Sequence, residues 1–308
     1  MTLFTLIIAL LIEQIRPLPV DRWVLQPLRS LSGNLFARFG GGQGGHGRLV
    51  WLSVVVLGTL LTAVLHYLLW ELHPVFAFAF NVAVLFLTMG FRRENRFFSE
   101  IHLALRMGEL DRARALLADW RGRDCGGADA SELARLAIEQ ALVGAHRSLF
   151  GVAFWFVILP GPSGAVMYRL ARFFADEWGR GAQAESDDSC RFARRGFELI
   201  DWLPARLTAA SFSVVGDFEG AVYCWRTQAV LWPDKSSAIL LASAAGALGV
   251  RLGMPVHESG GIVDRPELGL GDEASADYMQ STVGLIWRAL LVCLFLLVLV
   301  GLAGWVGG

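Results

Sequence analysis

Long runs of apolar residues alternate with arginine-rich polar stretches along the chain. The clearest apolar run covers residues 49–70 and is interrupted by only four polar side chains. A helix of about 20 apolar residues crosses the roughly 30 Å hydrocarbon core of a bilayer. The pattern therefore predicts a membrane-spanning helix there, and further spans at residues 74–91 and 284–306.

A central apolar stretch, residues 149–170, is broken in its middle by Pro-Gly-Pro-Ser-Gly at positions 160–164. Arginines stand on both sides, with Arg147 before it and Arg169 and Arg172 after it. Irregular backbone at membrane depth needs protein or water around it. We expect either a hairpin that returns to the same side or a crossing with charge clusters on both sides.

The polar stretches carry their own helical signals. Residues 92–146 repeat apolar positions at helical spacing, with a turn at Gly108 and a third helix starting at Ser131, for which Asp129 and Ser131 are N-cap candidates. Residues 17–47 are predicted to be a loop that ends in a glycine-rich linker, and Pro204 favours a helix start.

These patterns predict an all-α fold, a polytopic helical bundle integral to the membrane. We expect a single domain over residues 1–308, with a cytoplasmic helical insertion at 92–148 and a polar loop at 254–283. Residues 2–12 form a short apolar segment that either crosses the bilayer or lies at its surface.

Composition supports a membrane location and gives no indication of nucleic-acid binding. The chain is 55% hydrophobic and 18% charged, whereas ordinary soluble domains carry about 25% charged residues. The net charge is −1, so we expect the lipid bilayer as a partner and no nucleic acid. Ten arginines between positions 92 and 147 place the main polar loops in the cytoplasm by the positive-inside rule. We therefore expect a multi-pass protein of the inner (plasma) membrane, and no feature indicates an oligomeric state.

The four cysteines stand apart from one another and from histidines at ligand spacing. Neither a zinc site nor a disulfide framework is predicted, and no metal ligands are assigned from spacing.

Three motifs before the last span resemble the CbiB/CobD family of cobalamin-biosynthesis proteins. They are IDWLPARL at 200–207, SAAGALGVRLG at 243–253 and the glycine- and acid-containing run at 260–272. GRD at 122–124, followed by a helix that contains Glu139, continues the match. The resemblance covers most of residues 90–300 and implies an adenosylcobinamide-phosphate synthase, which joins cobyric acid to aminopropanol or its phosphate with ATP and Mg²⁺.

The resemblance also implies site residues, because that chemistry needs carboxylates and phosphate-binding cations. The candidate catalytic residues are Asp124, Glu139 and Asp264. The candidate substrate-binding residues are Arg147, Asp201, Arg206, Arg251, Arg265 and Asp272. A corrinoid is the implied substrate.

The chain departs from the family pattern in ways that keep a second reading open. Where the family has ENTVDG, residues 143–148 read VGAHRS. The start of the chain, the stretch 154–164 with Arg147 before it, and IDWLPARL are also similar to AmpE, a membrane protein of the β-lactamase induction pathway. The alternative is therefore a non-enzymatic AmpE-like signalling protein. A transporter ranks last, since no internal repeat accompanies the broken segment.

Overall fold

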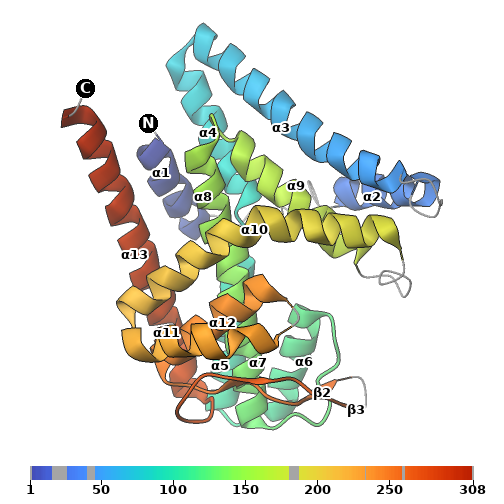
Figure 1. Ribbon diagram of the computed structural model, residues 1–308, viewed down its shortest axis with the longest axis vertical. Coiled ribbons are helices and arrows are strands. Elements are labelled where there is room, and N and C mark those ends of the chain that lie inside the picture. The colour runs from blue at the N-terminus through green and yellow to red at the C-terminus, as the bar shows by residue number, and fades with distance from the viewer. Residues whose placement is uncertain are drawn as a thin grey trace. The chain divides into compact units, whose positions relative to one another are not determined.

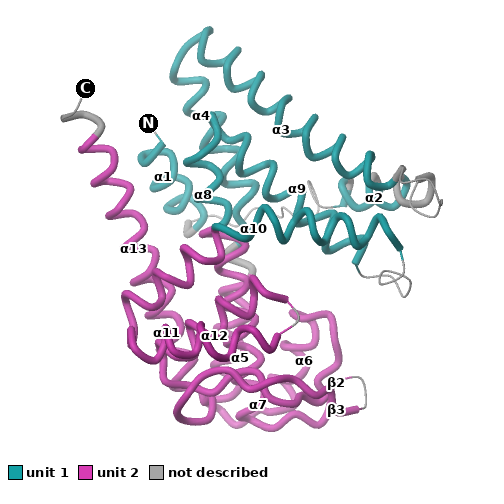
Figure 2. The backbone as a smooth tube through the Cα atoms, in the orientation of Figure 1, with its two compact units in different colours: residues 1–90, 151–203 teal, residues 91–150, 204–308 magenta. Residues whose placement is uncertain are grey.

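The computed structural model describes residues 2–15, 26–39, 46–179, 187–232, 234–258 and 261–306. The chain forms two compact units, residues 1–90 with 151–203 and residues 91–150 with 204–308 (Figure 2). The predicted helical insertion at 92–148 thus falls in the first segment of unit 2.

In the described part of unit 1, all regular secondary structure is helical. Its helices are α1 (Thr2–Ile15), α2 (Gln26–Phe39), α3 (His46–Leu72), α4 (Pro74–Thr88), α8 (Gly151–Ile158), α9 (Ser163–Trp178) and the first part of α10 (Asp188–Val215). The long helix α3 packs against α4 and α9, and α1 packs against α4. Figure 1 shows α3 as the long light-blue helix. The loop predicted for residues 17–47 is wrong at 26–39, which are helical; much of the glycine-rich linker lies outside the described residues.

The predicted break at 160–164 is confirmed as a tight turn between α8 and α9, which pack against each other as a helical hairpin. Gly161 takes a left-handed conformation with φ 60°. A Cβ atom on Gly164 would lie 1.9 Å from the carbonyl oxygen of Trp155. Both positions therefore require glycine, one for its backbone conformation and one for the close approach of the two helices.

Helix α10 contains Pro204 in its interior, so the predicted helix start at this proline is wrong. Proline has no N–H to donate to the carbonyl oxygen four residues earlier, which here is that of Ile200. The indole Nε1 of Trp155 donates to this oxygen at 3.2 Å. The hydrogen bond satisfies a carbonyl that the proline leaves open and explains how the helix continues through it.

Unit 2 combines helices with two short β-ribbons. Its helices are α5 (Phe91–Arg106), α6 (Leu110–Arg121), α7 (Ala130–Ala145), the rest of α10, α11 (Phe218–Thr227), α12 (Lys235–Leu248) and α13 (Ala276–Val306), with a π-helical turn at His146–Phe150 and a 3-10 turn at Ala229–Leu231. Helix α7 contacts α5, α12 and α13 and lies largely buried among them. Gly108 turns the chain between α5 and α6 with φ 74°, and the Asp129 side chain caps α7, as predicted.

The strands lie in the predicted polar loop at 254–283, or just before it. Strand β1 (Leu252–Gly253) pairs antiparallel with β4 (Glu267–Leu268), and β2 (Val256–Glu258) pairs antiparallel with β3 (Gly261–Val263). The sequence analysis predicted no strands here, because runs of two or three residues are too short to show an alternating pattern.

Among the residues that the structure describes, three helical runs are long and apolar enough to cross a membrane: Gly47–Leu72, Ala130–Ile158 and Ala276–Ala303. The first and third agree with predicted spans and bury only a small share of their residues within the fold, whereas most of the second is buried in protein. Helix α4 is a shorter apolar helix of 15 residues. The architecture is that of an all-α membrane protein.

Candidate functional site

One face of the buried helix α7 carries three charged side chains: Glu132, Arg135 and Glu139. Residues three, four or seven apart lie on the same face of a helix. All three are less than 10% exposed. Charged groups are rarely buried without partners, so their contacts identify the surface that this face recognises.

The three side chains bind the backbone of the segment 253–258. Glu139 Oε1 accepts a hydrogen bond from the Gly253 N–H at 2.8 Å, Arg135 Nη2 donates to the Pro255 carbonyl at 2.8 Å, and Glu132 Oε1 accepts from the His257 N–H at 2.6 Å.

The partners follow a regular register in which the helix and the segment run in opposite directions. Moving along α7 by three or four residues, about 5 Å, corresponds to moving back two residues along the segment. The backbone of the segment therefore forms hydrogen bonds with helix side chains instead of with a neighbouring strand. Glu132 and Glu139 act as acceptors, and Arg135 between them acts as a donor.

Arg265 binds the N-terminal end of this segment, the end that Glu139 also contacts. Its guanidinium donates to both oxygens of Glu139, at 2.9 and 3.3 Å, and also to the carbonyl oxygens of Gly253 and Met254. It lies over the ring of Trp232, 5.4 Å from the ring centroid. Because these contacts occupy the guanidinium, Arg265 holds the segment and Glu139 in place.

Glu258 ties the same segment to the loop after α6. Its carboxylate accepts from Arg121 at 2.6 Å and from Arg123 at 3.1 Å. Burial favours the neutral acid, but the two guanidinium groups outweigh this effect and lower the pKa of Glu258 below its ordinary value. The Glu132 Oε2 atom accepts a hydrogen bond from Nδ1 of the His257 ring at 2.8 Å. We call the group of eight side chains the polar layer: Arg121, Arg123, Glu132, Arg135, Glu139, His257, Glu258 and Arg265.

Two of the predicted catalytic carboxylates lie beside the polar layer, in exposed positions. Asp124 follows Arg123, and its Oδ1 accepts a hydrogen bond from the Gly126 N–H at 3.1 Å. Asp264 precedes Arg265 on the connection between β3 and β4. The third, Glu139, is buried within the layer with both oxygens occupied. The motifs around positions 122–124 and 260–272 both lie in unit 2, and each contacts the segment 253–258.

Arg251 and Asp272 flank the ribbon of β1 and β4: Arg251 directly precedes β1, and Asp272 follows β4 in the chain. The Arg251 N–H donates to the Asp272 carbonyl at 2.9 Å. The Arg251 guanidinium pairs with Glu267 at 3.9 Å and Glu273 at 3.5 Å, while Asp272 Oδ2 accepts from the Tyr278 hydroxyl at 3.1 Å. This second cluster is held by contacts of its own.

The remaining predicted binding residues lie outside the polar layer. Arg147, in the π-helical turn, contacts the Asp234 carboxylate at 3.4 Å. Arg206 is half-buried on α10. Asp201 is 1% exposed, accepts from the Tyr168 hydroxyl at 2.6 Å and belongs to unit 1.

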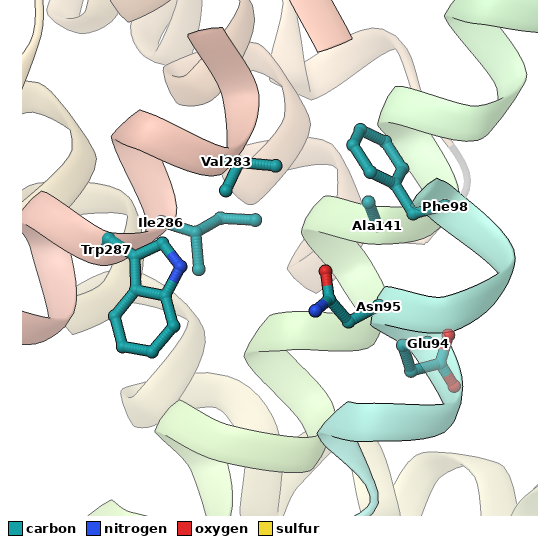
Figure 3. A pocket seen from close by; sticks show the side chains of 7 residues that line it. All are labelled: Glu94, Asn95, Phe98, Ala141, Val283, Ile286 and Trp287. Carbon is teal, nitrogen blue, oxygen red and sulfur yellow. The ribbon is translucent and has the colours of Figure 1, made fainter. Parts of the chain in front are cut away.

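A small cavity lies between α5, α7 and α13 (Figure 3). In that view the Asn95 amide points into it, whereas the carboxylate of Glu94 points away from Trp287. Glu94 accepts from the Trp120 Nε1–H at 2.7 Å. The cavity volume of about 20 Å³ suits a single water-sized group, which is too small for an organic substrate.

Sequence reasoning missed six members of the polar layer: Glu132, Arg135, His257, Glu258, Arg121 and Arg123. A signal for the first two was present, since they share the spacing of Glu139 on an otherwise apolar helix. His257 gave none, because its partner is 125 residues away in the chain.

Comparison with known proteins gives one consistent result. A family model described as CobD/Cbib protein matches residues 6–286. The chain is 32% identical to "Cobalamin biosynthesis protein CobD" of Stutzerimonas stutzeri over 95% of this chain and 96% of the relative. It is 33% identical to the protein of the same name from Chromobacterium violaceum over 70% and 69%. It is 27% identical to "Cobalamin biosynthesis protein CbiB" of Salmonella typhi over 90% and 86%. No solved structure matches.

Proposed function

The chain belongs to the CobD/CbiB family of cobalamin biosynthesis proteins, and on that basis we propose that it joins cobyric acid to aminopropanol, or to its phosphate, through an amide bond. The observation that carries the proposal is the match along residues 6–286, which includes every side chain of the polar layer.

The proposed reaction activates a carboxylate before the amine attacks. The carboxylate oxygen takes the terminal phosphoryl group of ATP, which releases ADP and leaves an acyl phosphate. The amine nitrogen then bonds to the acyl carbon, the phosphate departs with the electron pair of the broken C–O bond, and the nitrogen loses a proton. Such a sequence needs groups that stabilise the developing oxyanion and bind phosphate.

We assign the carboxylate and arginine side chains of unit 2 to these tasks by position. Asp124 and Asp264 are exposed beside the polar layer, so they can reach substrate and are the proposed catalytic carboxylates. Glu139 has both oxygens occupied, so we assign it the role of a positioning residue. Arg265 holds the same segment from the other side. The roles of Arg147, Asp201, Arg206, Arg251 and Asp272 in substrate binding stay predictions.

The magnesium that the family implies has no matching ligand set among the described residues. There, no group of three or more His, Cys, Asp or Glu side chains is arranged to hold a metal ion. No step of the proposed reaction is therefore assigned to a metal.

The proposed location is the inner membrane, with the polar layer on the cytoplasmic side. Unit 2 contains the arginine-rich stretch 92–147, and such stretches are retained in the cytoplasm. ATP is available on that side. The comparisons give no support to the AmpE-like alternative.

Complementation tests the proposal. A strain that lacks the synthase and cannot grow on cobyric acid without it receives the full-length gene. We expect growth to be restored; a wild-type protein that reaches the membrane at normal level without restoring growth would overturn the assignment.

Two variants test the proposed catalytic carboxylate within the same assay. We expect Asp264→Asn to slow growth at least tenfold at limiting cobyric acid. The matched control is Asp111→Asn, an exposed carboxylate on α6 that pairs only with Arg114 among the described side chains and should leave growth unchanged. Equal growth of the two variants would exclude Asp264 from the reaction.

A further inference from the structure

Arg135 is the least satisfied charged group of the polar layer. Its side chain is 6% exposed, yet its one hydrogen bond to a described residue is the bond from Nη2 to the Pro255 carbonyl. Nε is closed off from solvent without a partner. A guanidinium has five N–H donors, so most of the donors of Arg135 are unused.

The neighbouring carboxylates do not supply the missing partner. Glu139 pairs with Arg265, Glu132 with His257, and Glu258 with Arg121 and Arg123. Among the described residues, no carboxylate oxygen lies within ion-pair distance of Arg135. The layer contains three carboxylates and four arginines, so its arginines outnumber its carboxylates by one.

Burying a charged group whose donors are mostly unpaired costs free energy. Native proteins retain such a group only where another contribution offsets that cost. Replacing a buried ion pair with well-packed apolar residues of similar volume is often neutral or stabilising. Stability alone therefore does not explain why an arginine occupies this position of α7.

One further nitrogen of the Arg135 guanidinium, Nη1, differs from Nε in its contact with solvent. Nη1 also has no partner among the described residues, and it is not among the buried atoms that are closed off from solvent. The covering segment is not in a relaxed conformation: Met254 has φ 64°, which costs a non-glycine residue of order 1 kcal/mol. The guanidinium therefore contacts a strained segment and keeps one nitrogen, Nη1, that is neither bonded to a described residue nor fully closed off from solvent.

We propose that Arg135 binds an oxyanion, either a phosphate or a carboxylate group, through its unused guanidinium donors. Planar guanidinium donors match both groups in geometry. The inference rests on the proposed ligase function, because its substrates carry both kinds of group, and it names the residue that would bind them.

A thermal-shift titration tests this inference without requiring catalysis. The full-length protein in detergent is heated with sodium phosphate, with sodium propionate, or with sodium chloride at equal ionic strength. We expect phosphate or propionate, but not chloride, to raise the unfolding midpoint in a saturable way. A response to phosphate alone identifies a phosphate source, and a response to propionate alone identifies a carboxylate. No anion-specific shift with either would overturn the proposal.

Variants assign the effect to the residue. Arg135→Gln should weaken the apparent affinity at least tenfold, whereas Arg112→Gln, which removes an exposed arginine paired with Glu109 on α6, should leave it unchanged. If Arg135→Gln does not fold, Arg135→Lys, which keeps the charge but loses the fork, should weaken the affinity at least threefold. Wild-type affinity in whichever variant folds would overturn the inference.

The two proposals fail in distinguishable ways. An Arg135-dependent shift in a protein that does not restore growth would sustain the oxyanion site and overturn the ligase assignment. Conversely, the wild-type gene could restore growth while the Arg135→Gln variant binds phosphate and propionate as tightly as wild type. That result would sustain the ligase assignment and overturn the oxyanion site at Arg135.

Discussion

The carboxylate of Glu139 receives two hydrogen bonds from the guanidinium of Arg265, 126 residues further along the chain, at 2.9 and 3.3 Å. The Gly253 N–H donates to the same carboxylate. Two sequence motifs that appear unrelated in the linear sequence are thereby parts of one polar layer. These bonds, with those from Arg265 to the Gly253 and Met254 carbonyls, use most of the hydrogen-bonding groups of both side chains. The structural role of the pair is therefore to hold the backbone of the segment between β1 and β2.

Removing Glu139 should destabilise the protein strongly. Glu139→Ala leaves the Arg265 guanidinium and the Gly253 N–H without their acceptor in a buried site, and breaking such pairs costs about 3–5 kcal/mol. Chemical unfolding in detergent measures the change. Glu100→Ala, which removes an exposed carboxylate paired with Arg96, should change the free energy of unfolding by less than about 1 kcal/mol. Equal stability of the two variants would contradict the assigned role.

Acid should weaken the contact between the β2–β3 ribbon and the loop after α6. The pKa of Glu258 is lowered, since Arg121 and Arg123 outweigh the opposing effect of burial. A group whose pKa is lower in the folded state contributes stability that is fully present above its unfolded value, 4.5, and is lost as pH falls through the folded value.

The measurement compares wild type with Glu258→Gln from pH 7 to pH 3. We expect the difference in unfolding midpoint to be constant above about pH 5 and to shrink below the ordinary pKa of the carboxyl. A difference that stays constant down to pH 3 would show that Glu258 is not held as an ion.

The hydrogen bond from Trp155 to the Ile200 carbonyl should be worth more than an ordinary one because Pro204 leaves that oxygen without a helical donor. Trp155→Phe should cost about 1–3 kcal/mol. In a Pro204→Ala background, the new N–H can donate to Ile200, so the same substitution should cost less. A double-mutant cycle measures the coupling between the two sites, and a coupling energy of zero would contradict this account of α10.

Gly151 should tolerate no side chain. A Cβ atom there would lie 2.4 Å from the Tyr168 ring and hydroxyl, and Tyr168 is fully buried with its hydroxyl bonded to Asp201. Gly151→Ala should therefore destabilise the protein by about 1–3 kcal/mol or more. Gly284→Ala is the matched control on α13, where an added Cβ meets no atom within 4 Å; it should be neutral or slightly stabilising. Similar losses for both would show that helix context, not the contact with Tyr168, sets the effect.

The sequence pattern predicted correctly those helices whose signals lie within a few neighbouring residues. The helices α5, α6 and α7 and the cap at Asp129 follow from apolar spacing and capping residues within a few positions of one another. Pattern failed at Pro204, because the compensating donor, Trp155, comes from another helix. It also missed α2, whose charged and apolar residues lack the length of apolar run that marked the spans.

The functional site was harder to predict from the sequence than the fold, because its contacts join residues far apart in the chain. Family resemblance pointed to Glu139 and Arg265, and the structure places them in contact. The partners of Glu132 and Arg135 are backbone groups more than 100 residues away, and no side-chain pattern encodes a contact with backbone. What makes Arg135 unusual is the absence of a carboxylate partner among the described residues, and that becomes visible only when every neighbouring carboxylate has been accounted for.

The most direct test is the formation of the amide bond by the purified full-length protein. Cobyric acid, ATP and either aminopropanol or its phosphate are incubated with the protein in detergent, and the product is identified by its mass, the sum of acid and amine less one water. We expect the product with wild type and with Glu100→Gln, and at least a tenfold lower initial rate with Glu139→Gln. A folded wild-type protein that forms no amide with either amine, or a Glu139→Gln variant that works at the wild-type rate, would contradict the account.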